Sequence, residues 1–214
     1  GAIKVGTRTA PEAIVGTPHY VRAEGDIEIT EVESANGITT LKTSVGDELK
    51  YATSGDVKLE SETGRIVETM TDKVELPANY MELIAREFNV KVNAETLEIS
   101  NNYGDIEIDE TEYISEDVVT ITGEGVGEVS YYTSNNITVE SQKGDIATAA
   151  GVVIVGNQVK LSGQHIGSVD NPVGVSANLT YINRLQGDID IQSITGIGTT
   201  ICIRGPAPAD DPEG

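Results

Sequence analysis

Carboxylates are the most numerous residues of this chain that could do chemistry. The sequence holds 35 Asp and Glu against 14 Lys and Arg, and its formal net charge is −21 at pH 7. Paired carboxylates serve as general acid and base in polysaccharide hydrolysis, and hard cations such as calcium take carboxylate oxygens as ligands. Asp105 and Glu128, which the spacing below places on successive coils, form one such pair. A chain this acidic supplies such pairs by chance, so we expect no catalytic, cofactor-binding or metal-binding residue and no enzymatic activity.

Tyrosines are the second group that could bind a ligand, because aromatic rings stack on sugars and the chain has no Trp. The candidate ligand face consists of Tyr103, Tyr113, Tyr131 and Tyr132. The alternative is that these side chains cover the edge of a sheet. His19 and His165 lie too many coils apart to share a site, and the sequence has no phosphate-binding loop and no calcium-binding nonapeptide repeat.

Composition narrows the class of protein. The net charge argues against nucleic acid, whose phosphates need clustered Lys and Arg. No apolar run approaches the roughly 18 residues of a membrane helix, so we expect no membrane insertion. The acidity favours solubility and repulsion between like surfaces, with calcium binding as the alternative. The single Cys202 excludes an intramolecular disulfide and a cysteine-built zinc site; its alternation with Ile201 and Ile203 leaves open whether it is buried.

A repeat of about 20 residues must position these side chains. Three blocks align with one another: ITVESQKGDI (137–146), VKLSGQHIG (159–167) and LTYINRLQGDI (179–189). Glycines at similar points in the pattern are separated by 18 to 23 residues, with one gap of 40 that is two repeats long. These glycines are Gly25, Gly46, Gly64, Gly104, Gly125, Gly144, Gly167 and Gly187. A fixed period of this length is typical of a solenoid.

Alternation of apolar and polar residues follows each glycine. In the segments that begin at Gly25 and Gly104, Asp-Ile-Glu-Ile places the isoleucines on one face and the acids on the other. The sequence therefore predicts an all-β fold, a right-handed parallel β-helix of coils of about 20 residues with the isoleucines inside. We expect the glycines to form its corners through positive φ.

One segment breaks this alternation. Met81, Ile84 and Phe88 fall at the spacing of one helix face, and Pro77 suits a first helical turn. The spacing predicts a short lateral helix near 77–88 that carries these three side chains as a contact patch. The alternative is an irregular coil.

The chain divides into three expected parts. Residues 1–24, with Pro11 and Pro18, are expected to form an entry coil or cap, 25–203 the β-helix, and 204–214 an acidic, proline-rich linker or tail. Both ends are typical of a piece of a longer protein.

The segment HIGSVDNPVGV (165–175) resembles the repeat of large exoproteins and adhesins of the filamentous-haemagglutinin type, in which a Gly-Asp-Ile-Gly-x-x-Asp-Asn-Pro phrase recurs. His165 stands where that phrase has Asp. The resemblance covers 137–203 well and the earlier part only through the Gly-Asp-Ile segments. It implies a right-handed β-helical shaft that is exported, with adhesion or presentation as its role, and it carries over no functional residue.

Three functions follow as expectations. The first is a non-enzymatic structural or adhesive segment of a secreted or cell-surface protein, with neighbouring domains, copies placed end to end, or host and cell-surface glycans as partners. The alternatives are a polysaccharide-binding or polysaccharide-cleaving β-helix, and a cation-stiffened surface filament or S-layer component. The expected location is extracellular or at the cell surface.

Overall fold

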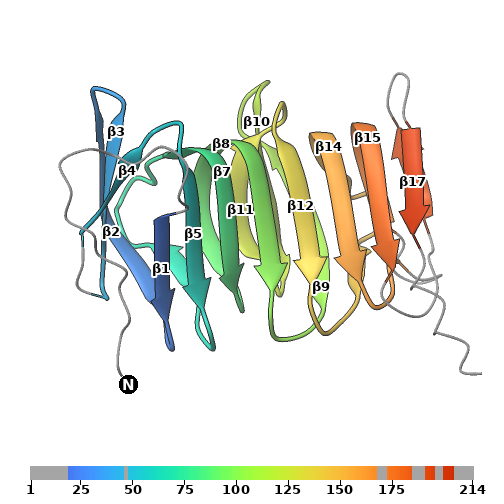
Figure 1. Ribbon diagram of the computed structural model, residues 1–214. Helices are drawn as coiled ribbons and strands as arrows, with labels where there is room; N and C mark the ends of the chain where they lie inside the picture. The colour runs from blue at the N-terminus through green and yellow to red at the C-terminus, as the bar shows by residue number, and fades with distance from the viewer. Residues whose placement is uncertain (1–18, 46–47, 168–172, 185–190, 196–199, 205–214) are drawn as a thin grey trace, which may run out of the picture.

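The described part of the chain is built from β-strands alone. The computed structural model describes residues 19–45, 48–167, 173–184, 191–195 and 200–204, and from residue 184 onward only the backbone. These residues hold 17 strands and no helix, and the strands form one mixed sheet (Figure 1). The strands are β1 (His19–Ala23), β2 (Ile27–Ala35), β3 (Ile38–Thr43), β4 (Glu48–Ala52), β5 (Asp56–Ser61), β6 (Ile66–Glu68), β7 (Leu76–Ala85), β8 (Phe88–Asn101), β9 (Ile106–Tyr113), β10 (Val118–Glu124), β11 (Gly127–Tyr132), β12 (Asn136–Ser141), β13 (Ile146–Thr148), β14 (Ile154–Gly163), β15 (Val173–Arg184), β16 (Ile191–Thr195) and β17 (Thr200–Arg204).

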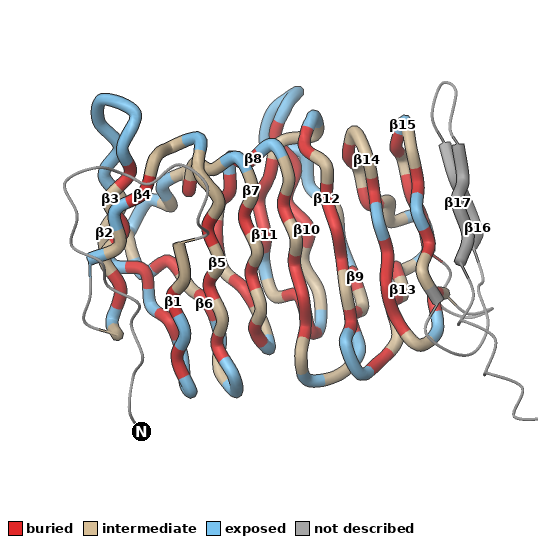
Figure 2. The backbone as a smooth tube through the Cα atoms, viewed as in Figure 1, coloured by how far each residue is buried: buried red, intermediate tan, exposed pale blue. Residues whose placement is uncertain are grey.

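Eight strands form a continuous parallel row, which we call the first row. Its members are β1, β5, β7, the second half of β8, β12, β14, β15 and β17, and each pairs in parallel with the next. One register position of this row contains Val21, Leu59, Leu83, Ile99, Val139, Leu161 and Ile182, all of them buried. Figure 2 shows how buried and more exposed residues alternate along these strands. The core therefore continues from strand to strand along the row.

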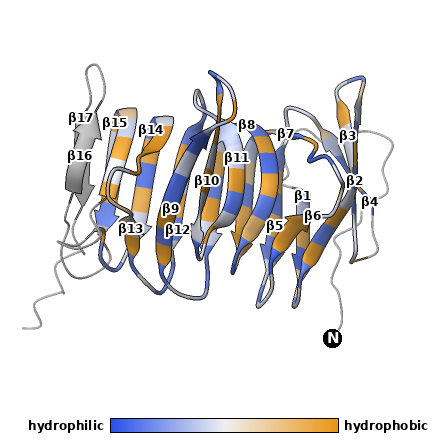
Figure 3. Ribbon diagram, turned by 180° about the vertical axis from the view of Figure 1, so that it is seen from behind, coloured by the Kyte–Doolittle hydropathy of each residue, from blue (hydrophilic) through white to orange (hydrophobic). Residues whose placement is uncertain are grey.

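We call the segment that leaves a first-row strand a corner. The strands that follow the corners form a second row. Here β2 pairs in parallel with β6, β6 with the first half of β8, and β9 with β13. Ile27, Ile29, Ile106, Ile108 and Ile146 are buried on these strands. The inward face that the Asp-Ile-Glu-Ile pattern predicts is confirmed. Figure 3 shows the same alternation of hydrophobic and hydrophilic residues from behind.

Two antiparallel excursions interrupt the parallel pairing. β2, β3 and β4 form one meander, and β9, β10 and β11 form the other. The first begins at Asn36 and Gly37, whose φ values of 53° and 78° suit a two-residue hairpin. Gly125 lies in the turn between β10 and β11, so the expectation that it forms a corner is wrong. The segment from Gly104 to Gly144 holds this meander where the spacing predicts a further coil.

The predicted helix near 77–88 is wrong, because this segment is the strand β7 followed by the start of β8. Met81, Leu83 and Ala85 point inward and Ile84 outward, with strict alternation. β7 pairs in parallel with β5 on one side and with β8 on the other. Backbone pairing on both edges, together with the burial of every second side chain, outweighs a helical spacing that Met81, Ile84 and Phe88 satisfy by coincidence.

The chain also contains a longer repeat of about 80 residues. The sequence YATSGDVKLESETGRI (51–66) aligns with YYTSNNITVESQKGDI (131–146), and both meanders follow a Gly-Asp-Ile-Glu-Ile segment. Tyr51 and Tyr131 are both fully buried. β1 lies within the expected cap of residues 1–24, yet it pairs with β5 as the other first-row strands pair with their neighbours.

Candidate functional site

The corner aspartates are the repeated polar residues whose position could indicate a site. Asp26 Oδ1 accepts a hydrogen bond from the backbone N–H of Arg65 at 2.8 Å, and Asp105 Oδ1 from that of Asp145 at 2.9 Å. Asp145 Oδ1 accepts in turn from the N–H of His165 at 3.0 Å. Each carboxylate thus binds the backbone of the corner that stacks on it. The spacing of Gly104, Gly125 and Gly144 predicts that Asp105 and Asp145 lie two coils apart. That prediction is wrong, because β9 and β13, the strands that follow them, are direct neighbours.

The serines three positions before Gly64 and Gly144 close the turn. Ser61 Oγ accepts from Gly64 N at 2.9 Å and donates to Gly25 O at 2.8 Å. Ser141 makes the same two bonds, with Gly144 N and with Gly104 O, both at 2.8 Å. These two hydroxyls therefore each bind the backbone of two stacked corners.

Among the corner glycines, Gly64 and Gly144 allow a close approach of two corners and do not have positive φ. Of those described, only Gly125 and Gly167 have positive φ. A Cβ on Gly64 would lie 2.5 Å from Asp26 N, and one on Gly144 would lie 2.6 Å from Asp105 N. The expectation of positive φ is therefore wrong for most of these glycines. Gly46 and Gly187 lie outside the described residues.

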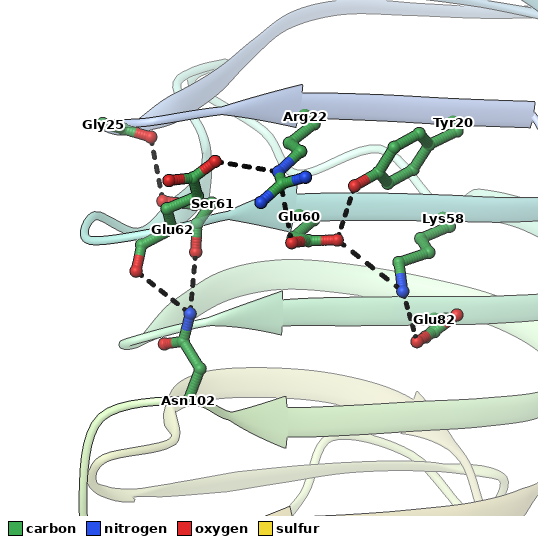
Figure 4. A network of polar contacts seen from close by, with 9 residues as sticks. All are labelled: Tyr20, Arg22, Gly25, Lys58, Glu60, Ser61, Glu62, Glu82 and Asn102. Atoms are coloured by element: carbon green, nitrogen blue, oxygen red, sulfur yellow. Dashed lines mark hydrogen bonds and ion pairs between the residues drawn. The ribbon is translucent and has the colours of Figure 1, made fainter. Parts of the chain in front are cut away.

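Polar side chains gather on the outer face of the first row (Figure 4). Glu60 accepts from Tyr20 Oη at 2.5 Å and lies 3.3 Å from Arg22 Nε. Lys58 Nζ lies 2.8 Å from a carboxylate oxygen of Glu82 and 3.7 Å from one of Glu60. Burial and the bond to Glu60 raise the pKa of Tyr20 to about 12. Acids and bases here pair with one another across neighbouring strands.

A second polar cluster joins the segment just before β7 to β8 and β11. Glu75 accepts hydrogen bonds from Tyr132 Oη at 2.6 Å and Asn93 Nδ2 at 3.0 Å, and lies 3.2 Å from Lys91 Nζ. The Tyr132 bond in particular lowers the pKa of Glu75. Lys73 forms an ion pair with Glu128 beside it. This cluster is a second candidate for chemistry in the described part of the chain.

Glu68 is the buried carboxylate near this cluster. Its oxygens accept from Lys91 N at 2.6 Å and Val74 N at 3.0 Å. Burial raises the pKa of its carboxyl, and perturbed buried carboxylates are common in active sites. In the 80-residue repeat, however, Glu68 corresponds to Thr148, whose Oγ1 accepts from Gly174 N at 2.7 Å. Both side chains accept a hydrogen bond from a backbone N–H of a later strand, so this position makes a backbone contact in both halves of the repeat.

The four tyrosines of the expected ligand face do not form one surface. Tyr103 and Tyr113 are exposed, at 62% and 59%, whereas Tyr131 is fully buried and donates its hydroxyl to Val155 O at 2.8 Å. Tyr132 follows Tyr131 in β11 and so points to the opposite face. Arg86 lies over the Tyr103 ring, 4.6 Å from its centroid.

The contact patch expected from Met81, Ile84 and Phe88 is divided in the same way. Met81 and Phe88 are core residues, and only Ile84 faces outward, half-buried. The burial of Met81 and Phe88 follows from the alternation of β7 and β8, a signal that the apparent helix spacing concealed.

The remaining predicted residues have separate neighbours. Asp105 and Glu128 do not pair, since Asp105 binds the corner of Asp145 and Glu128 binds Lys73. His165 Nδ1 lies 2.7 Å from Asp145 Oδ1, and the ring of His19 lies 6.0 Å from that of Tyr51. The side chain of Cys202 lies outside the described residues.

Among the described residues, no group of three or more His, Cys, Asp or Glu could hold a metal ion, and no helix there is long and apolar enough to cross a membrane. No family model, curated protein or solved structure matches the chain.

Proposed function

We propose that this chain is a right-handed parallel β-helix that serves as a non-enzymatic structural or adhesive segment of a large secreted or cell-surface protein. Each coil of such a fold rests on the next, so its repeated side chains serve to hold the stack together. The handedness follows the resemblance of 165–175 to filamentous-haemagglutinin-type repeats and the general preference of parallel crossovers.

One observation carries this proposal: the repeated polar residues bind the backbone of the neighbouring strand or corner. Asp105 and Ser141 both join the corner at Gly104 to the one at Gly144. Asparagines also join neighbouring strands, through hydrogen bonds between their side chains. Asn157 Nδ2 donates to Asn136 Oδ1 at 2.9 Å, and Asn178 Nδ2 to Asn157 Oδ1 at 3.1 Å. Residues repeated for catalysis would converge on one place, whereas these recur along the stack.

The register adds a second support. In the first row each residue faces its counterpart in the next strand, without a bulge from β5 to β7 or from β8 to β12 to β14. Strands lie about 4.8 Å apart in such a ladder. A shaft of this kind separates whatever lies at its two ends by a fixed length, which is the task of a structural segment.

The experiment that tests this combines shape and activity on the whole chain. We expect small-angle X-ray scattering to show an elongated particle, and far-ultraviolet circular dichroism to show strand without helix. Acidic and neutral polysaccharides incubated with the protein should yield neither new reducing ends nor unsaturated products. A compact particle would contradict the β-helix, and released products would contradict the non-enzymatic role.

Adhesion is tested separately on immobilised glycans. Tyr103→Ala removes the exposed ring under Arg86, and Tyr132→Phe serves as the control that keeps a ring of equal size. Glycan binding that is lost in Tyr103→Ala and kept in the control would make this corner the adhesive surface. Absence of binding to any glycan leaves a structural segment as the role and contradicts glycan adhesion.

A further inference from the structure

Like charges face each other directly across neighbouring strands. Glu107 on β9 lies opposite Glu124 on β10, and Glu82 on β7 lies opposite Glu98 on β8. Neighbouring strands are about 4.8 Å apart, and like charges placed directly opposite are destabilising. The pleated register therefore fixes carboxylate pairs at a distance where they repel.

These pairs are only partly compensated. Glu82 has Lys58 at 2.8 Å, and Glu98 accepts from Tyr80 Oη at 2.7 Å. Among the described residues, Glu107 and Glu124 have no Lys or Arg within 4.0 Å. Burial and then Glu98 raise the pKa of Glu140, which is the result expected where carboxylates crowd on one face.

The shortage of basic partners extends over the whole chain, since 35 carboxylates share 14 Lys and Arg. Ion pairs alone cannot neutralise such a surface. Repulsion between exposed charges extends over the Debye length, which is about 10 Å at 0.1 M salt and about 3 Å at 1 M. At 0.1 M, carboxylates one or two strands apart still repel, whereas at 1 M even nearest neighbours are largely screened.

We propose that the native state of this protein is suited to a medium of high ionic strength, and that monovalent salt stabilises it by screening carboxylates on neighbouring strands. The net charge of −21 supplies the repulsion, and the parallel and antiparallel ladders fix its geometry. The ion acts through its concentration and not through a particular binding site. This inference stands independently of the adhesive role.

The test is the melting temperature of the whole chain in chloride salts, because chloride separates screening from the exclusion effects of sulfate and phosphate. We expect the melting temperature to rise continuously from about 0.05 M to about 2 M NaCl and equally in KCl. CaCl2 at matched ionic strength should give a similar rise. A melting temperature that stays constant or falls with NaCl would overturn the proposal, and so would full stabilisation by millimolar CaCl2 alone, which would show a specific cation site.

Two variants, each lacking one carboxylate, test where on the protein the repulsion acts. Glu124→Gln relieves the repulsion with Glu107, so at low salt we expect its melting temperature to rise by roughly 1 to 3 °C above that of the wild type. The gain should vanish near 2 M NaCl. Glu60→Gln is the control, because it removes equal charge from the contacts with Tyr20, Arg22 and Lys58, and its melting temperature should fall at low salt. Equal shifts in the two variants would refute a geometric origin of the repulsion.

Discussion

Alanine at two corner glycines with the same local sequence should have opposite effects on stability. Gly104 and Gly144 each stand before Asp-Ile at the exit of a first-row strand. A Cβ on Gly104 would meet nothing within 4 Å, and one on Gly144 would lie 2.2 Å from Asp105 Oδ1, 2.6 Å from Asp105 N and 2.6 Å from Gly104 C. Neither glycine has positive φ, so the two positions differ in space alone.

The expected loss of stability in Gly144→Ala depends on which atoms must move to make room for the Cβ. At Gly144 two of the three close atoms belong to the backbone of the stacked corner, so a side-chain rotation cannot relieve the overlap. Overpacking of a well-packed site costs about 1–3 kcal/mol. The added Cβ would also disturb the hydrogen bond between Asp105 and Asp145. We expect Gly144→Ala to lose about 3 kcal/mol, a fall in melting temperature of roughly 6 to 12 °C for a domain of this size. Gly104→Ala should gain up to about 1 kcal/mol, because alanine restricts the unfolded chain.

The measurement is thermal unfolding of both variants and the wild type by circular dichroism in one buffer. Gly64→Ala and Gly25→Ala repeat the comparison in the first half of the chain, where a Cβ on Gly64 would lie 2.5 Å from Asp26 N and one on Gly25 would meet nothing within 4 Å. If Gly144→Ala melts with the wild type, or if Gly104→Ala is as damaging as Gly144→Ala, the stacking of corners described above is incorrect.

Three further outcomes are expected. Ile146→Asp places an unpaired charge in the core and should cost several kcal/mol in a denaturant titration, whereas Glu107→Lys should stay within about 0.5 kcal/mol of the wild type or stabilise it; the reverse order would mean that inside and outside are exchanged. Asp105→Ala should lower stability by about 1.5–3 kcal/mol, the range for a hydrogen bond to a charged group, and a silent variant would refute its role at the corner. The pKa of Glu68 is raised in the folded protein, so folding favours the protonated carboxyl. Its contribution to the free energy of unfolding is therefore present at low pH and is lost as pH rises through the folded pKa. The stability of Glu68→Gln relative to the wild type should increase with pH, and a constant difference would contradict this.

Alternation predicted the inner and outer faces of the strands well. The burial of Ile27, Ile29, Ile106 and Ile108 agrees with the pattern, because period-two geometry fixes the face of each side chain whatever the partner strand is. The pattern does not specify which strand lies alongside. An antiparallel return and a parallel coil need the same alternation, so β3 and β10 were indistinguishable from coils by this criterion.

Local sequence signals distinguish an antiparallel return from a parallel coil. Asn36-Gly37 between alternating segments is the strongest short hairpin signal, and it begins the first meander. In the second meander the signal is a cluster of glycines, Gly123, Gly125 and Gly127. A Cβ on each would lie 1.9 to 2.2 Å from a backbone oxygen of a neighbouring strand or corner, so only glycine fits there. The spacing of glycines every 20 residues concealed this denser cluster, because Gly125 alone fits the longer period.

The candidate site was harder to predict than the fold, since the same residue types serve chemistry and architecture. Asp105, Ser141 and Glu68 have the side chains of catalytic groups, and what they do depends on the atoms that face them. In the structure those atoms are backbone amides and carbonyls of the neighbouring strand or corner, which sequence spacing cannot reveal while the neighbouring strand is misassigned. The 80-residue repeat supplies a comparison: Thr148 is the counterpart of Glu68, and both side chains accept a hydrogen bond from a backbone N–H of a later strand. A hydroxyl takes the place of the carboxylate there, so the position makes a backbone contact in both halves of the repeat.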